Sequence, residues 1–165
     1  MGWLARRGAI PLGYLNDAEK TAGTFIEIDG ERFVVPGDRA RLSADGTIEF
    51  LGRDSTTINT GGEKVFAEEV EDVISAHALV TDCLVLGRPS EKWGQEVVAL
   101  VVAPDAIDAE EIRSHIREHL AGYKVPRAIQ FVDRIPRTDA GKADRRAAQE
   151  LWRAGDPDAE AATSR

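Results

Sequence analysis

Residues 56–76 read TTINTGGEKVFAEEVEDVISA, a stretch that predicts two consecutive secondary-structure elements. Thr56 to Thr60 and Lys64 to Phe66 are rich in β-branched and apolar residues and flank Gly61-Gly62, a pair that favours the tight turn of a β-hairpin. From Glu68 to Ala76 the apolar residues recur at helical spacing, at Val70, Val73 and Ile74. The stretch therefore predicts a hairpin followed by an amphipathic helix.

Downstream of this stretch, strands and helices alternate. The predicted strands are Val80 to Leu86, Glu96 to Val102 and Ala128 to Val132. Asp108 is suited to cap a helix that runs to about Leu120, whose inward residues are Ile112, Ile116 and Leu120. A final helix is expected from Ala143 to Trp152. The expected fold class is α+β: a small domain over residues 56–152, with the hairpin and a short mixed sheet flanked by helices.

Upstream, residues 1–52 read as irregular segments and short strands. The predicted strands are Thr24 to Ile28, Arg32 to Val35, Arg39 to Ser43 and Thr47 to Leu51. So little apolar material cannot form a core of its own. We expect residues 1–52 to be the terminal β segment of a larger N-terminal domain that is missing from this chain. The polar residues 153–165 are expected to form a disordered tail.

Composition excludes several classes of protein. The 165 residues carry a net charge of −8, which argues against a nucleic-acid binder. Cys83 is the single cysteine, so no disulfide framework or thiolate metal site is expected, and it reads as an inert core residue. The sequence shows no transmembrane segment and no signal-peptide core. We expect a cytoplasmic location, with peripheral membrane association left open.

Lys142 lies on a loop of turn-forming residues, PRTDAGKADR, at residues 136–145. An ammonium group on such a loop can enter a cleft and stabilise charge in phosphoryl transfer. A solvated surface lysine is the alternative. A cluster of basic residues in this last third of the chain suggests an anionic ligand, although some of them could simply line a solvated face: Lys124, Arg127, Arg134, Arg137, Lys142, Arg145 and Arg146.

Two other motifs are weaker. His115 to His119 has the H-x-x-E-H spacing of one zinc-protease motif. We expect no metal there, because His119 is expected close to the Ile112/Ile116 face and no third ligand is evident. Gly141-Lys142 does not complete a phosphate-binding P-loop, since Pro136 and Ala143 occupy positions that need Gly and Ser or Thr.

The order of several short motifs carries a family resemblance. Gly13-Tyr14-Leu15-Asn16-Asp17 with Glu19, Thr21, Ala22, Thr24 and Phe25 is similar to a G-Y-x-N-x-P-E-x-T-x-x-x-F segment. Further matches are Gly37-Asp38, Gly52-Arg53, Gly61 to Phe66 with Glu68 to Glu71, Gly122 to Pro126, and the loop of Lys142. Together, over residues 1 to 152, they resemble the C-terminal part of an AMP-forming acyl-CoA synthetase, one of the adenylate-forming ligases. The variant at Ile58 to Phe66 resembles the branch of fatty-acid and steroid-side-chain CoA ligases.

The resemblance implies roles for individual residues. Asp38 matches an aspartate that binds the ribose hydroxyls of ATP or AMP, and Arg53 matches an arginine that contacts the same nucleotide. Lys142 matches the catalytic lysine that bridges the substrate carboxylate and the α-phosphate. Residues 53–55 match a hinge between two domains.

The resemblance assigns other residues to the second half-reaction, in which the acyl group passes to CoA. Gly61, Gly62, Glu63 and Lys64 match a loop that lines the channel for the pantetheine of CoA, and Lys124 is a plausible contact to CoA phosphates. In the family the small domain rotates about the hinge, which withdraws the lysine and presents the glycine loop. The implied ligands are a carboxylic acid, ATP and CoA, with Mg²⁺ held by residues outside this chain.

Three positions depart from the family pattern, and other functions stay open. Ser55 replaces the usual Asp or Lys at the hinge, Pro36 replaces Thr before Gly37-Asp38, and Ala67 replaces a Pro. With no phosphate loop and no acyl pocket in its sequence, the chain is not expected to catalyse alone. The alternatives are an amino-acid-adenylating domain that loads a carrier protein and a non-catalytic module that binds CoA or a nucleotide.

Overall fold

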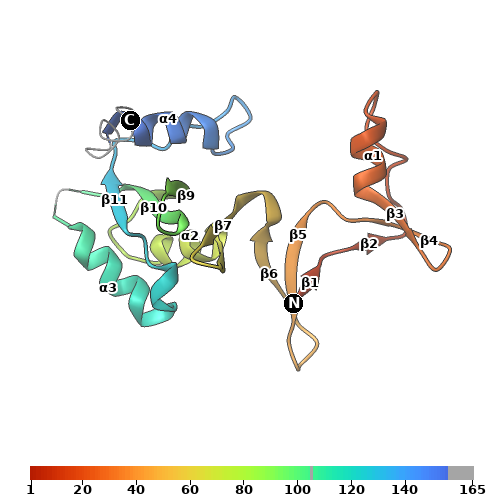
Figure 1. Ribbon diagram of the computed structural model, residues 1–165, viewed down its shortest axis with the longest axis horizontal. Helices are drawn as coiled ribbons and strands as arrows, with labels where there is room; N and C mark the ends of the chain where they lie inside the picture. Colours follow the sequence, from red (N-terminus) through yellow and green to blue (C-terminus); the bar gives the residue numbers. More distant parts are fainter. Residues whose placement is uncertain (105, 156–165) are drawn as a thin grey trace. The chain divides into compact units, whose positions relative to one another are not determined.

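The computed structural model describes residues 1–104 and 106–155, and its chain divides into two compact units, Met1–Ser55 and Thr56–Arg165 (Figure 1). Each unit is described by itself. Within the described residues, no helix is both long and apolar enough to span a membrane.

The first unit contains two small antiparallel sheets and a short helix. One sheet has the order β1-β5-β6, formed by Gly2–Trp3, Asp38–Leu42 and Ile48–Arg53. The other has the order β2-β4-β3, formed by Arg6–Arg7, Glu31–Val34 and Phe25–Ile28. The turn residues Asp29, Gly30 and Gly46 all have positive φ, as the sequence signals for tight turns require.

The helix of this unit, α1 (Ala18–Thr24), was not predicted from the sequence, which suggested only irregular segments and strands. Asp17 caps it, because its Oδ1 accepts a hydrogen bond from the Lys20 amide at 2.9 Å. The Thr21 hydroxyl donates to the Asp17 carbonyl at 2.6 Å and also accepts from the Tyr14 amide. Seven residues without a buried side chain give no apolar stripe, so capping rather than periodicity defines this helix.

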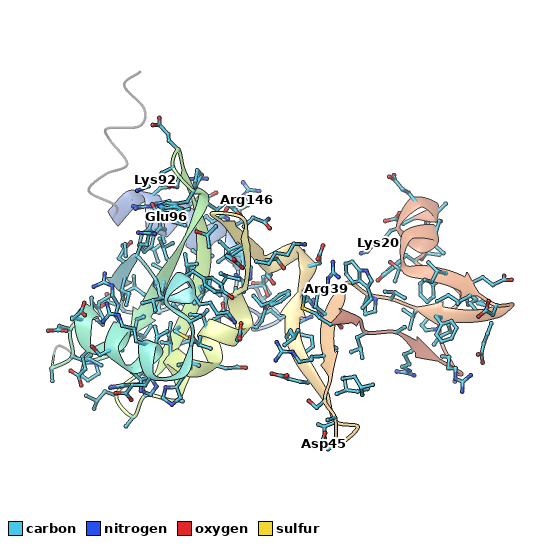
Figure 2. All side chains as sticks on the ribbon, turned by 60° about the horizontal axis from the view of Figure 1, so that its bottom comes forward. Lys20, Arg39, Asp45, Lys92, Glu96 and Arg146 are labelled. Carbon is cyan, nitrogen blue, oxygen red and sulfur yellow. The ribbon has the colours of Figure 1, made fainter. Side chains whose placement is uncertain are left out.

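The first unit buries few apolar side chains. Among its described residues only Ala40 and Leu51 are buried hydrophobics, whereas Leu42, Ile48 and Phe50 are exposed. Figure 2 labels Arg39, whose guanidinium lies 3.4 Å from the centre of the Trp3 ring and also pairs with Asp54 at 2.8 Å. Polar and stacking contacts therefore order much of this sheet.

The second unit is built on a sheet of five strands with the path β11-β10-β7-β8 and β9 paired to β10. The strands are β7 (Thr57–Thr60), β8 (Glu63–Phe66), β9 (Asp82–Ser90), β10 (Gly94–Val102) and β11 (Ala128–Phe131). β10 and β11 run parallel and the other pairs antiparallel, so the sheet is mixed. The helices are α2 (Ala67–Ser75), α3 (Ala109–His119) and α4 (Arg145–Gly155). Short 3-10 turns span Asp54–Thr56 (η1) and Gly122–Lys124 (η2).

Side chains that alternate along β9 and β10 divide the core into two halves. Figure 1 shows α4 on the opposite side of these strands from α2 and α3. One set of side chains packs with α2 and α3; it includes Val85, Val97, Ala99 and Val101 together with Val70, Ile74, Ile112 and Ile116. The opposite set packs with α4; it includes Leu84, Leu86, Val98 and Leu100 together with Ala148 and Trp152. A sheet buried on both faces explains the nearly continuous apolar runs of these strands. The α+β class predicted from the sequence is confirmed.

The predicted helices are present with small shifts at their ends. Asp108 caps α3 as expected, since its Oδ1 accepts from the amides of Glu110 and Glu111, both at 2.9 Å. α4 begins at Arg145 rather than Ala143, because Asp144 forms its N-cap and accepts from the Ala147 amide at 3.0 Å. The predicted disordered tail, residues 153–165, begins too early, because residues 153–155 belong to α4; residues 156–165 lie outside the described part of the chain.

Candidate functional site

Asp38 and Arg53, the two residues predicted to contact a nucleotide, are directly paired on neighbouring strands of the first unit. Asp38 in β5 is the cross-strand partner of Arg53 in β6, and Arg53 Nε donates to Asp38 Oδ1 at 3.1 Å. The Asp38 side chain is 17% exposed and that of Arg53 is 61% exposed. Gly37, with φ 95°, precedes the aspartate, and its carbonyl accepts from the Asp54 amide at 2.9 Å. A carboxylate and a guanidinium therefore lie side by side at one end of this small sheet, where β5 begins and β6 ends.

The glycine loop forms the turn of the β7–β8 hairpin in the second unit. Thr60 pairs with Glu63 across it, and Gly61 and Gly62 have φ of 59° and 89°, the left-handed region that a tight hairpin turn requires. Glu63 and Lys64 are exposed at the start of β8. The four predicted residues thus lie together on one hairpin.

Trp93 supports this hairpin, a role that sequence reasoning missed. The Gly61 amide donates to the Trp93 carbonyl at 2.9 Å, and a Cβ at Gly61 would lie only 2.8 Å from the Trp93 ring. A Cβ at Gly62 would meet no atom within 4 Å. Gly61 is therefore a glycine because of close packing, whereas Gly62 leaves open space above its backbone. No local pattern links a tryptophan to a turn more than 30 residues away.

Lys124, the predicted contact to CoA phosphates, is bound within the protein. Its Nζ donates to both carboxylate oxygens of Glu69 at 2.6 Å, and its side chain is only 15% exposed. Glu69 belongs to α2, and Lys124 ends η2. For Lys124 to bind a phosphate, it would have to leave or share this carboxylate.

Lys142 lies on a tight loop between two short paired segments. Arg137 and Ala143 form an isolated β-bridge, the Thr138 amide donates to the Lys142 carbonyl at 2.8 Å, and Gly141 has φ 76°. Arg137 braces the loop, because its guanidinium donates to the Gly141 carbonyl at 3.0 Å and to Asp82 at 2.7 Å. The Lys142 side chain is exposed and forms no ion pair within residues 1–104 and 106–155. The backbone is thus held firmly while the ammonium group remains available.

Most of the basic cluster in the last third of the chain is neutralised by neighbouring carboxylates. Within the described residues, five of its seven members form ion pairs: Lys124, Arg127, Arg137, Arg145 and Arg146. Figure 2 labels Glu96, the partner of Arg127 at 3.7 Å and of Arg88 at 2.7 Å. The cluster as a whole is therefore weak evidence for an anionic ligand. Among the described residues, Arg134 and Lys142 are exposed and have no ion pair, and Lys142 differs from Arg134 in lying on the loop that Arg137 braces.

Two half-buried groups, Glu71 in α2 and Cys83 in β9, have shifted pKa values. Burial raises the pKa of the Cys83 thiol to about 11, so the thiol stays protonated and unreactive at neutral pH. Burial likewise raises the pKa of the Glu71 carboxyl, against the opposing effect of the Val85 amide and Arg145. Neither group resembles an activated nucleophile or general base, and both act within the core.

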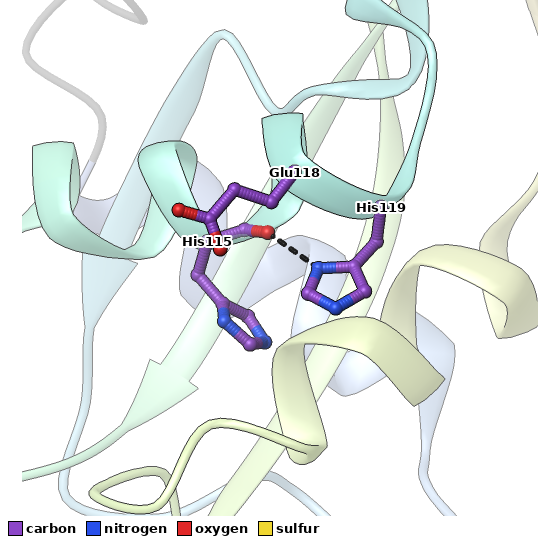
Figure 3. Close-up of side chains that lie close together, drawn as sticks. All are labelled: His115, Glu118 and His119. Atoms are coloured by element: carbon purple, nitrogen blue, oxygen red, sulfur yellow. Dashed lines mark hydrogen bonds between the residues drawn. The ribbon is translucent and has the colours of Figure 1, made fainter.

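One group of described side chains could hold a metal ion. His115, Glu118 and His119 on the last turns of α3 each offer a ligand atom, and these atoms lie within 4.8 Å of one another (Figure 3). His119 is exposed, whereas Ile112 and Ile116 on the same helix are buried. Glu118 is also exposed and supplies the third group that sequence reasoning did not identify.

The predicted residues therefore fall into separate groups. Asp38 and Arg53 form one pair in the first unit. In the second unit the glycine hairpin, the Lys124–Glu69 pair and the Lys142 loop are three distinct features. In the second unit, a mixed sheet covered by helices on both faces carries a loop that presents the exposed Lys142.

Comparison with known proteins identifies that domain. Residues 69–142 match the family described as AMP-binding enzyme C-terminal domain. The chain is 60% identical over 152 residues to the medium-chain acyl-CoA ligase Mig of Mycobacterium avium, covering 91% of this chain and 28% of the relative. It is 47% identical over 174 residues to a 3-oxocholest-4-en-26-oate–CoA ligase of Rhodococcus rhodochrous, covering 99% of this chain and 31% of the relative.

Comparison with solved structures gives matches to enzymes of the same kind. The o-succinylbenzoate CoA synthetase of Bacillus subtilis, in complex with its acyl-adenylate intermediate, matches with a TM-score of 0.80 at 29% identity over 90% of this chain and 30% of that one. ATP-bound MatB of Rhodopseudomonas palustris matches with a TM-score of 0.71 at 31% identity over 85% of this chain and 28% of that one. Over residues 69–142 the chain carries an AMP-binding enzyme C-terminal domain. It spans less than a third of the length of the relatives named here.

Proposed function

We propose that this chain is the C-terminal part of an ATP-dependent acyl-CoA ligase that activates a carboxylic acid as acyl-AMP and transfers the acyl group to CoA. The observation that carries the proposal is Lys142, whose exposed ammonium group stands on a rigid loop inside a domain of the AMP-binding enzyme family. The names of the relatives favour a medium-chain fatty acid or a steroid side-chain acid as substrate.

The proposed role of Lys142 follows from charge. In the first half-reaction a carboxylate oxygen attacks the α-phosphorus of ATP and pyrophosphate leaves. Two anions must approach one another, so a cation between them stabilises the transition state and orients the attack. Lys142 has a compact, unpaired charge within the described part of the chain, and its backbone is fixed by the Arg137–Ala143 bridge.

The residues of the first unit fit a nucleotide. Arg53 Nε donates to Oδ1 of Asp38 in the ion pair, and the two oxygens of a carboxylate together offer enough acceptor positions to accept hydrogen bonds from a ribose diol as well. Arg53 is largely exposed and can contact the same ligand. The division of the chain after Ser55 supports a hinge at residues 53–55 and a mobile small domain from residue 56 onward. No residue of this chain is assigned to Mg²⁺.

The glycine hairpin fits the second half-reaction, in which the CoA thiol attacks the acyl carbonyl and AMP leaves. The open space above Gly62 lets a thin chain such as pantetheine approach the backbone closely. The molecule that accepts the acyl group distinguishes this function from that of a domain that loads a carrier protein. The relatives are named as CoA ligases, which favours free CoA as the acceptor.

The test is carboxylate-dependent ATP–pyrophosphate exchange by the full-length protein and its Lys142→Ala variant, with fatty and steroid acids. We expect exchange to fall by roughly 10²-fold or more, while acyl transfer from preformed acyl-adenylate to CoA is retained. Lys20→Ala, which removes another exposed lysine, is the control and should keep full exchange. Unchanged exchange in Lys142→Ala would contradict the proposed role.

A further inference from the structure

The three histidines of the chain gather in one place. His115 and His119 lie one turn apart on α3, with ring centres 4.9 Å apart, and His77, just after α2, packs edge-on against His115 at 5.1 Å. His77 also faces Glu111, at 3.7 Å. None of these residues takes part in the function proposed above.

Main-chain carbonyls fix the tautomers of two of these rings. His115 Nε2 lies 3.0 Å from the Val73 carbonyl, and His119 Nδ1 lies 2.9 Å from the His115 carbonyl (Figure 3). A carbonyl oxygen can only accept, so each of these nitrogens carries the ring hydrogen. The other nitrogen of each neutral ring, His115 Nδ1 and His119 Nε2, therefore has a free lone pair. Metal-binding histidines are held in this manner, with one N–H donated to a backbone carbonyl.

His77 differs from this pair. Its Nδ1 accepts from the Leu79 amide at 3.3 Å, so its lone pair is occupied and its remaining Nε2 carries the hydrogen that faces Glu111. The structure thus separates two rings that can bind a metal from one that cannot without breaking a backbone contact.

Glu118 supplies a carboxylate in the same part of α3 as the two histidines. One ring nitrogen of His115, one of His119 and a carboxylate oxygen of Glu118 lie within 4.8 Å of one another, and Glu118 has no ion pair within the described residues. The neighbouring cation Arg117 is occupied by Glu110 at 2.6 Å and does not compete for it. Glu118 and His119 are exposed, so small side-chain rotations can bring the three atoms to the roughly 2.0–2.2 Å from a common centre that Zn²⁺ requires.

We propose that His115 Nδ1, a Glu118 carboxylate oxygen and His119 Nε2 bind one divalent transition-metal ion, for which Zn²⁺ is the appropriate probe. Two imidazoles and a carboxylate suit Zn²⁺ and leave one tetrahedral position for water. The bound ion would join residues of the last turn of α3, which ends at His119, and would stabilise the folded domain through binding.

The experiment titrates the chelator-treated 165-residue chain with ZnCl₂ by isothermal calorimetry and follows its melting temperature. We expect one equivalent to bind and the melting temperature to rise. His119→Gln and Glu118→Gln change exposed side chains and should each weaken binding by roughly tenfold or more. Circular dichroism checks that both variants keep their helices.

Glu111→Gln is the matched control, because it removes a carboxylate of the same helix outside the three-residue group, and it should bind Zn²⁺ as the unmodified chain does. Absence of binding by the unmodified chain would overturn the proposal. So would equal affinity in the His119→Gln variant, or a loss of binding that follows Glu111→Gln instead.

Discussion

Arg145 is linked to Val85 by two hydrogen-bonded routes. One is a direct bond to the Val85 carbonyl, and the other passes through the Glu71 carboxylate to the Val85 amide. Its Nη1 donates to the Val85 carbonyl at 2.7 Å, and its Nη2 donates to Glu71 Oε1 at 2.9 Å. The same carboxylate oxygen accepts from the Val85 amide at 2.9 Å. This network joins α4, α2 and β9, and it fixes the point at which the chain leaves the loop of Lys142.

Replacing Arg145 by Met should therefore destabilise the second unit. The change leaves the half-buried Glu71 carboxylate without its cation and removes a hydrogen bond to Val85, a loss of about 2 kcal/mol in the free energy of unfolding. Urea denaturation measures this loss. Arg146→Met is the control, because Arg146 is 90% exposed and its one ion pair among the described residues is with Glu150 on its own helix, so the change should cost less than about 0.5 kcal/mol. Equal effects of the two substitutions would refute the importance of the network.

The two glycines of the β7–β8 turn should respond differently to substitution by alanine. Both adopt positive φ, which costs an alanine about 1 kcal/mol, but only at Gly61 would the new Cβ collide with the Trp93 ring. We expect Gly61→Ala to lower the free energy of unfolding by at least about 1 kcal/mol more than Gly62→Ala does. In a Trp93→Ala background this difference should disappear. A difference that persists there would mean that the contact with Trp93 is not its cause.

Cys83 should make the protein less stable in alkaline solution. Burial raises the thiol pKa from 9.0 to about 11, so between these values the unfolded chain has lost a proton that the folded chain retains. Unfolding is then favoured as pH rises, and stability should fall by about 1 kcal/mol between pH 8 and pH 10 because of this group. Cys83→Ala should lack this part of the alkaline decrease. Identical pH profiles for the two chains would show that the thiol is not shielded.

Local patterns in the sequence predicted much of the second unit. The Gly61-Gly62 turn, the apolar stripe of α2 and the Asp108 cap of α3 each depend on neighbours within a few residues, and all are present. Periodicity failed at α1, whose seven residues bury no side chain.

Contacts between distant residues could not be predicted from one sequence. Glu69 and Lys124 are 55 positions apart, and Glu71 and Arg145 are 74 apart, so only the packed fold brings each pair together. The basic cluster is the clearest consequence. It suggested a ligand, but the fold supplies carboxylate partners for most of its members, which left Lys142 as the residue on which the functional proposal depends.

The Lys124–Glu69 pair gives a final prediction for the full-length protein, on the proposal that Lys124 contacts a CoA phosphate. Glu69 now competes with any phosphate for the Lys124 ammonium, since both of its oxygens accept from Nζ at 2.6 Å. Glu69→Gln removes the competing charge and should lower the KM for CoA, whereas Lys124→Gln should raise it. Carboxylate-dependent ATP–pyrophosphate exchange, which needs no CoA, should be unchanged in both variants. Shifts of the KM in the same direction would assign the pair a purely structural role, because loss of either partner would then damage the site equally.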